Sequence, residues 1–553
     1  MRTRRLIATL GGLAAVLAAG PAQAAGAPVA RFTVPVQLLG ASGGEPSIAT
    51  DRLGNVYVDG PQGIPAGVND EPGVGFWASH NDGTSFGPAQ HIGSFAGGGD
   101  SDVIVDPKGT VFTDDLEAAA TDVCKSTDKG KTFTSIGPVP DPTNCSSLPY
   151  GQVGPSDDRP WLNSGPHGRL YLTYHEFVSA QPLIFRSDNG GADLFGAGPC
   201  GSIITDPTIE ANVPTDITGG TLVSKPVTDA AGNLYVMFTT TTQAENAAAA
   251  AAGKPSGTFS QIYLAVSTDH CQTFTDHTVF DGATLFGTND VQFGDIFNAL
   301  TVDGAGNLYA VAAGYVGHKT FDSVAKLYLF SSTDHGTRWT GPIELGPAGA
   351  AKMMPSAIGG PRSGQLAIGY FRTVNGVTDP NLTSGHWTYA TAETTNATSP
   401  NPTFGYTDVR PGYLYHVGDI CNLGILCGAV PGGPSDRSLL DFTSATLDGQ
   451  GCPLFTFAGN PPALGGEAKG TWNFVTRQTS GCFPAAVAVT VHPPVTATHP
   501  TAATAPAANG ALPETGLDPR LPIIALGALA LALTLLRLGR SKLARSRRGP
   551  PAG

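Results

Sequence analysis

The chain has 553 residues, of which only 14% are charged, and its formal net charge is −13 at pH 7. An acidic chain repels phosphate-rich partners, so the composition argues against nucleic acid and anionic membrane surfaces as ligands. Its 73 glycines and 45 prolines indicate many strands joined by turns rather than a helical protein.

The first residues have the features of a secretory signal peptide. Basic Arg2, Arg4 and Arg5 precede an apolar run at 6–20, and the small residues at 22–24 offer a cleavage site. The run is too short for a membrane anchor and no stop-transfer pattern follows it. We therefore expect residues 1–25 to be removed on export.

All eight cysteines lie in the exported part of the chain. An even number of cysteines in an exported protein indicates disulfides rather than metal thiolates. The nearest pair in the sequence, Cys421 and Cys427, is expected to be bonded, whereas the spacing leaves the other pairings open. No zinc-type Cys/His cluster is present, so no metal ligands are predicted.

A β-hairpin pattern repeats seven times along the chain. Each copy has alternating apolar residues on both sides of an Asp- or Gly-containing turn, in which glycine permits a positive φ. The copies lie at 47–58, 103–112, 161–174, 227–238, 300–312, 356–371 and 444–457. A fixed supersecondary unit repeated along a chain is typical of a solenoid or a propeller.

A second motif follows the first five hairpins. It occurs as SHNDGTSF (79–86), STDKGKTF (126–133), RSDNGGADLF (186–195), STDHCQTF (267–274) and STDHGTRW (332–339). We expect the aspartates to bond backbone amides within each turn and the aromatic residue to pack between sheets. The aspartates assigned to this role are Asp82, Asp128, Asp188, Asp269 and Asp334.

These motifs resemble the Asp box, Ser-x-Asp-x-Gly-x-Thr-Phe/Trp, of the sialidase (BNR-repeat) superfamily. The resemblance covers residues 31–482 and implies an all-β propeller of four-stranded antiparallel blades, with the boxes at outer edges away from any ligand. Seven hairpins predict seven blades, and segment 32–38 is expected to supply the last blade's fourth strand. Six blades remain the alternative if the last copy is a separate cap.

In a propeller, the residues just before each innermost strand surround one mouth of the central channel. Charged and polar residues recur at this position, and we assign a ligand-binding role to Glu45, Asp100, Arg159, Lys225, Asn298 and Arg437. Other candidates at the rim are Asp102, Asp157, Asp158, Asp295, Met354 and Asp436. The set either caps strands and solvates a rim or converges on a polar ligand pocket.

Sialidases combine an arginine triad, a tyrosine nucleophile supported by Glu and an aspartate acid/base. The family's Phe/Tyr-Arg-Ile-Pro motif is absent from the corresponding RFTVPVQLLG segment, so the resemblance carries over the fold and not the catalytic residues. Two functions remain open. One is a propeller that binds glycans or surface proteins, with a divalent cation such as calcium possible at the acidic rim. The other is an exo-α-sialidase-type hydrolase using Asp158 or Asp295 as the acid and Tyr413 as the best-placed tyrosine.

The end of the chain has three parts in a fixed order. A Pro/Ala/Thr-rich spacer (483–511) leads to LPETG, an apolar stretch at 521–538 and a basic tail. The motif residues are Leu512, Pro513, Glu514, Thr515 and Gly516. The apolar stretch can just span a bilayer, and the basic tail keeps its own end cytoplasmic.

This order resembles the sorting signal of LPXTG wall-anchored proteins. The resemblance implies that a sortase cleaves after Thr515 and joins it to peptidoglycan on a Gram-positive cell surface. A plain C-terminal membrane anchor is the alternative. We expect a monomer with a surface insertion at 243–257, whose partners are the sortase, peptidoglycan and a glycan or surface-protein ligand.

Overall fold

The computed structural model describes the central part of the chain, with gaps. Its described residues are 30–62, 72–96, 99–117, 120–136, 157–176, 179–194, 198–213, 221–251, 259–282, 291–292, 298–316, 325–421, 427 and 435–484. The predicted signal peptide and sorting signal, and all but the first residues of the spacer, lie outside this set, so those assignments remain predictions. Among the described residues, no helix is long and apolar enough to cross a membrane.

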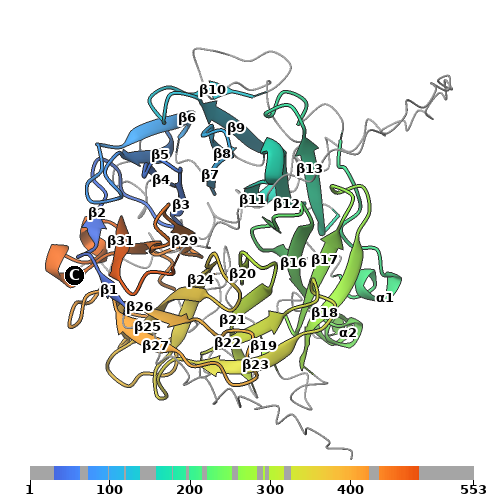
Figure 1. Ribbon diagram of the computed structural model, residues 1–553. Coiled ribbons are helices and arrows are strands. Elements are labelled where there is room, and N and C mark those ends of the chain that lie inside the picture. The colour runs from blue at the N-terminus through green and yellow to red at the C-terminus, as the bar shows by residue number, and fades with distance from the viewer. Residues whose placement is uncertain are drawn as a thin grey trace, which may run out of the picture.

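Seven antiparallel sheets surround a common centre (Figure 1). Blade one contains β3 (Ser47–Thr50), β4 (Val56–Gly60), β5 (Pro72–Ser79) and β6 (Gln90–Ala96). Blade two contains β7 (Val103–Val105), β8 (Val111–Glu117), β9 (Ala120–Ser126) and β10 (Thr134–Ser135). Blade three contains β11 (Asp157–Ser164), β12 (Leu170–Glu176) and β13 (Gln181–Ser187), with the 3-10 turn Pro166–Gly168 between its first two strands.

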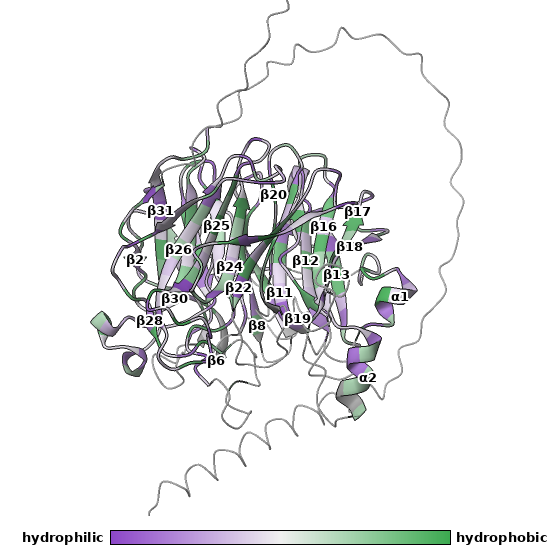
Figure 2. Ribbon diagram, turned by 90° about the horizontal axis from the view of Figure 1, so that it is seen from below, coloured by the Kyte–Doolittle hydropathy of each residue, from purple (hydrophilic) through white to green (hydrophobic). Residues whose placement is uncertain are grey.

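The next two blades have five strands each. Blade four contains β14 (Leu222–Val223), β15 (Val227–Thr228), β16 (Leu234–Thr240), β17 (Gln261–Ser267) and β18 (Thr275–Asp281). Blade five contains β19 (Val291–Gln292), β20 (Ala299–Val302), β21 (Leu308–Val316), β22 (Lys326–Ser332) and β23 (Thr340–Leu345). Two short helices lie at the periphery, α1 (Pro207–Glu210) and α2 (Gln243–Ala251) (Figure 2). Helix α2 forms most of the insertion expected in blade four.

Blade six contains β24 (Lys352–Gly359), β25 (Leu366–Thr373), β26 (His386–Thr394), β27 (Gly405–Asp408) and β28 (His416–Val417). Blade seven contains β29 (Ser444–Leu447), β30 (Pro453–Gly459) and β31 (Trp472–Ser480), with 3-10 turns at Pro462–Leu464 and Glu467–Lys469. The N-terminal strands β1 (Arg31–Phe32) and β2 (Val36–Gln37) complete it by pairing with β31.

This topology confirms the predicted seven-bladed all-β propeller. The last hairpin is a blade and not a cap, because its outer strand is supplied by the other end of the chain. Arg31 pairs with Ser480 and Val36 with Val475. The ring is therefore closed by a strand pairing that joins residues more than 400 positions apart.

The middle strands are buried because both of their faces pack against other blades. Every residue of β16 and β17 is buried. Between blades five and six, Tyr309 and Val311 share one apolar cluster with Leu366 and Ile368. Full burial of such a side chain stabilises the fold by about 1.5–3 kcal/mol, and this packing recurs at successive blade interfaces.

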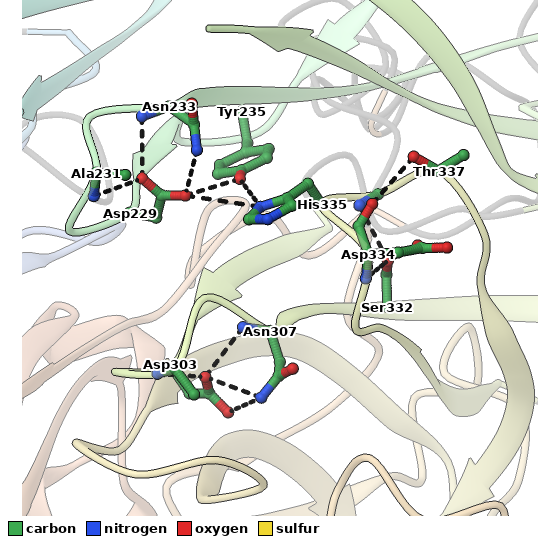
Figure 3. A network of polar contacts seen from close by, with 12 residues as sticks. Asp229, Ala231, Asn233, Tyr235, Asp303, Asn307, Ser332, Asp334, His335 and Thr337 are labelled. Carbon is green, nitrogen blue, oxygen red and sulfur yellow. Dashed lines mark hydrogen bonds and ion pairs between the residues drawn. The ribbon is translucent and has the colours of Figure 1, made fainter.

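One aspartate holds the turn of the inner hairpin in several blades: β3–β4, β15–β16 and β20–β21. Asp229 Oδ1 accepts the backbone N–H groups of Ala231 and Asn233 at 2.9 Å, and its other oxygen accepts the Tyr235 hydroxyl at 2.9 Å (Figure 3). The same arrangement recurs at Asp51 and Asp303. These are Asx-type turns, in which the carboxylate replaces a backbone acceptor.

The Asp boxes form the turns that follow β5, β9, β13, β17 and β22, at the end of the blade opposite the mouth. Asp128 Oδ1 accepts the amides of Lys131 and Thr132 at 3.1 and 2.9 Å. Hydrogen bonds, first from the threonine hydroxyl and then from its amide, lower the pKa of Asp128 and Asp269 to about 2. In box five, hydrogen bonding to Arg338 lowers the pKa of Asp334 to about 2.

Two boxes have a different register from the one predicted. In box one, Asn81 and not Asp82 accepts the Ser79 hydroxyl at 2.8 Å and the Ser85 amide at 3.0 Å. In box three, Asn189 has this role, whereas Asp188 pairs with Arg169 and Arg186 on the surface. The assignments of Asp82 and Asp188 are wrong, because an asparagine amide oxygen accepts the same bonds as the carboxylate.

Blade six has a related turn that the Asp-box motif does not reveal in the sequence. Thr394 Oγ1 donates to Asn396 Oδ1 at 2.7 Å, and the same oxygen accepts the Thr403 amide at 2.9 Å. The acceptor and the amide are seven residues apart here, compared with four in box two. Because its loop is longer, this turn does not have the Asp-box spacing in the sequence.

Disulfides join segments in several blades. The structure contains the predicted Cys421–Cys427 bond, as well as Cys200–Cys271 and Cys452–Cys482. Cys271 stands where the other boxes have glycine and has a φ of 74°, so box four combines a left-handed residue with a covalent link. No described cysteine is free, which is typical of exported proteins.

Candidate functional site

Four residues near the start of innermost strands have left-handed backbones. Glu45, Arg159, Met354 and Leu440 have φ values of 45°, 57°, 54° and 59°. The first three each precede a proline, and proline disfavours the right-handed helical region in the residue before it. Left-handed non-glycine residues are strained and occur often at functional sites. Glu45 and Leu440 precede the inner strands of blades one and seven, whereas Arg159 and Met354 lie within those of blades three and six.

Arg159 lies at the centre of a buried ionic cluster formed by these segments. Its two terminal nitrogens donate to the two carboxylate oxygens of Glu45 at 3.0 and 3.1 Å. Nη2 also lies 3.3 Å from Asp100 and 3.5 Å from Asp441. Although burial lowers it, the neighbouring acids raise the pKa of Arg159 above its ordinary value. The guanidinium carbon lies 4.9 Å from the centre of the Phe442 ring, a cation–π contact.

Asp100 interacts with the carboxyl groups of both Glu45 and Asp158. Burial raises the pKa of all three acids, while Arg159 opposes the rise. The three acids therefore form one interacting group, and Asp100 and Asp158 are its partly exposed members.

Asp441 is an acid of this cluster that the sequence interpretation did not name. Its carboxylate is 1% exposed, binds Arg437 and lies near Arg159. Burial raises the pKa of Asp441 to about 6, against the opposing charge of Arg437. The Asp441 amide donates to Glu45 at 2.8 Å. Leu440, the residue before Asp441, has a left-handed backbone. This conformation marks the position in the structure and cannot be read from the sequence alone.

A second group of acids surrounds Asp102. Its Oδ1 accepts the ammonium of Lys225 at 2.6 Å and the hydroxyl of Ser47 at 2.5 Å. Its Oδ2 accepts the Leu162 amide at 2.9 Å. Nearby, burial raises the pKa of Asp59 and Asp114 well above the ordinary value. Asp102 thus ties blades one, three and four together at the mouth.

The central channel contains a cavity of about 80 Å³ that Lys225 and Asn298 help to line. Asn298 is 4% exposed, and neither amide atom has a hydrogen-bond partner among the described residues. Lys225 has 30% of its side chain exposed and connects the mouth to this cavity. The cavity has room for a few water molecules.

The structure therefore brings together Glu45, Asp100, Asp158, Arg159 and Arg437, and places Lys225 and Asn298 beside them. Two predicted catalytic residues have other outcomes. Asp295 lies outside the described residues. Tyr413 lies between β27 and β28 at the outer edge of blade six, under the Arg410 guanidinium at 4.0 Å.

The described contacts of Tyr413, with Arg410 and Tyr415, do not join it to the mouth, so a catalytic role for this tyrosine is not supported.

Acids outnumber bases in the combined mouth cluster. The bases are Arg159, Lys225 and Arg437, and the acids are Glu45, Asp59, Asp100, Asp102, Asp114, Asp158 and Asp441. Within the described part of the chain, no group of three or more His, Cys, Asp or Glu side chains is arranged to hold a metal ion. Several of the acids instead pair with the bases, so the calcium expectation gains no support.

The fold and mouth define a seven-bladed propeller with an acidic, internally paired centre. No family model and no curated protein matches the chain. Among solved structures, it is similar to a protein of unknown function from Dyadobacter fermentans DSM 18053, at 13% identity and a TM-score of 0.43 over 82% of this chain and 99% of that one.

Two further similarities are to proteins that act on carbohydrates. The NanB sialidase from Streptococcus pneumoniae has a TM-score of 0.39 and 11% identity, covering 82% of this chain and 71% of the sialidase. A polysaccharide lyase of family PL25, an ulvan lyase, has a TM-score of 0.36 and 12% identity, covering 68% and 79%. These similarities are distant, and none of them identifies a function.

Proposed function

We propose that this protein is a cell-surface binding propeller that recognises uncharged or cationic glycans, or a surface protein, at the carboxylate-rich mouth. The observation that carries the proposal is that the Arg159 guanidinium is already paired with carboxylates of the protein. A receptor for an anionic sugar needs cationic groups that are free to meet the ligand carboxylate. Arg159 is 4% exposed and already faces Glu45, Asp100 and Asp441.

The partly open groups at the mouth favour hydroxyl-rich or cationic ligands. Asp100 and Asp158 are half-buried, and the side chains of Lys225 and Arg437 are about one-third exposed. These groups present both hydrogen-bond donors and acceptors, which suits a polyol. The excess of acids behind them opposes a further negative charge and favours a cation.

A glycan array tests this proposal with the fragment spanning residues 31–484. We expect binding to neutral or amino-sugar glycans, weakened in Lys225→Gln and Arg437→Gln. Lys326→Gln is the matched control, because Lys326 pairs with Glu344 on the exposed surface. Equal binding by all three variants would place the ligand elsewhere. Exclusive binding to sialylated glycans would contradict the charge argument.

A glycoside hydrolase remains the second candidate, and the partly exposed acid Asp158 beside Asp100 favours it. A general acid must hold a proton near neutral pH. Burial raises the pKa of Asp158, which favours its protonated form. On this reading Asp158 protonates the leaving group, with Arg437 contacting the substrate. Turnover of an aryl glycoside that is lost in Asp158→Asn would favour the hydrolase over the binding module.

A further inference from the structure

A second polar pocket lies on blade six, away from the mouth cluster. It has a volume of about 230 Å³ and is lined by Tyr370, Arg372, Tyr406, Asp408 and Gly346, among others. These residues come from β25, β27 and the segment just after β23. None of the ion pairs of the mouth involves them.

The pocket has one aromatic wall and one polar wall. Tyr406 is 47% exposed and stands on β27, at the outer edge of the blade. The polar wall is the Arg372–Asp408 pair, in which Arg372 donates through Nε and Nη2 to the two carboxylate oxygens of Asp408 at 2.8 and 2.6 Å. This fork is electrically neutral as a pair and still offers unused guanidinium N–H groups and carboxylate lone pairs.

A buried hydroxyl completes the site. Tyr370 is fully buried, and its hydroxyl has no hydrogen-bond partner among the described residues. It lies beside Gly346, where an added Cβ would stand 3.1 Å from the hydroxyl oxygen and 2.9 Å from Lys352 Cε. A side chain at this position would fill the wall next to the hydroxyl, and Gly346 leaves that space open.

We propose that this pocket binds one uncharged pyranose ring. The ring's axial C–H groups pack on Tyr406, and adjacent hydroxyls bond to the Arg372–Asp408 fork. A further sugar hydroxyl satisfies Tyr370, whose buried oxygen otherwise lacks a partner. The neutral fork disfavours a charged ligand, and the volume falls below the ~300 Å³ lower bound of drug-sized pockets, which fits a single ring.

This site does not depend on the proposed function of the mouth. Saturation-transfer NMR of the 31–484 fragment tests it with three probes: methyl β-D-glucopyranoside, methyl β-D-galactopyranoside and methyl α-D-mannopyranoside. We expect transfer to at least one glycoside, with an affinity loss of about tenfold in Tyr406→Ala and a smaller loss in Tyr370→Phe. Tyr406 is half exposed, so its replacement leaves the fold intact.

Arg169→Met is the control, because Arg169 pairs with Asp188 at the surface of blade three, in neither the mouth cluster nor the pocket. Retained transfer in this variant, together with loss in Tyr406→Ala, supports the pocket. Transfer that is lost only in Arg437→Gln moves sugar binding to the mouth and overturns the inference. Absence of transfer to all three probes, or equal transfer by wild type and Tyr406→Ala, also overturns it.

Discussion

Replacing Arg159 with methionine removes the cation around which the mouth is organised. The variant keeps an unbranched side chain of similar reach beside Phe442 and deletes the charge. Glu45 and Asp441 then stay buried, with only Arg437 to offset them. Removing one partner of a buried ion pair costs about 3–5 kcal/mol, because the other charge is left without compensation.

The loss of stability should depend on pH. Burial already raises the pKa of Asp441 to about 6, about two units above its ordinary value, which corresponds to about 3 kcal/mol. An acid whose folded pKa is raised favours the folded state below its unfolded pKa, and this contribution is lost as the pH rises through the folded pKa. Without Arg159 these pKa values rise further, so the variant should lose more stability at pH 7.5 than at pH 5.

Urea unfolding of wild type and Arg159→Met at both pH values measures the effect. Arg169→Met is the matched control, because Arg169 pairs with Asp188 at the surface with side chains 23% and 46% exposed, and such pairs contribute about 1 kcal/mol or less. The reasoning fails if the two variants lose equal stability, or if the loss in Arg159→Met is the same at pH 5 and pH 7.5.

Three other predictions concern the turns, the ring and the cell surface. Asn81→Ala should lose about 1 kcal/mol of stability through its lost hydrogen bonds. Asp82→Gly should lose none, because Asp82 has a φ of 57°, which glycine adopts without strain. The opposite ranking of the two variants in a thermal melt would indicate that Asp82, and not Asn81, holds the turn. Deleting residues 30–38 removes β1 and β2 and exposes the edge of β31, so size-exclusion chromatography should detect association; a monomer with unchanged cooperative unfolding would contradict this. Thr515→Ala should move the protein from the muramidase-released wall fraction to membrane and medium, and equal wall recovery would refute sortase attachment.

The repeats made the fold predictable from the sequence. Each hairpin carries its own turn chemistry, so seven copies predicted seven blades without any knowledge of long-range contacts. The closing strand was also predictable, because segment 32–38 alternates apolar and polar residues and the last blade lacked a fourth strand. The acceptor residues Asn81 and Asn189 of boxes one and three were harder to predict, because each has an aspartate beside it, Asp82 or Asp188, that also fits the Asp-box motif.

The mouth was predictable in its membership and not in its pairing. Glu45, Asp100 and Arg159 were predicted to lie at the mouth from their positions at the starts of inner strands. The ring brings them into contact across three blades. Which acid meets which base depends on the local backbone, such as the left-handed residues 159 and 440. Asp441 follows one of these turns, and its role emerged only from the three-dimensional arrangement.

The most direct test of the account is the release of 4-methylumbelliferone from its α-sialoside by the purified propeller. Because Arg159 is held by internal carboxylates and acids dominate the mouth, we predict no turnover above background between pH 4.5 and 7.5, with or without calcium. Robust release that is abolished by Arg159→Ala or Arg437→Ala would contradict the binding-propeller account and establish a sialidase.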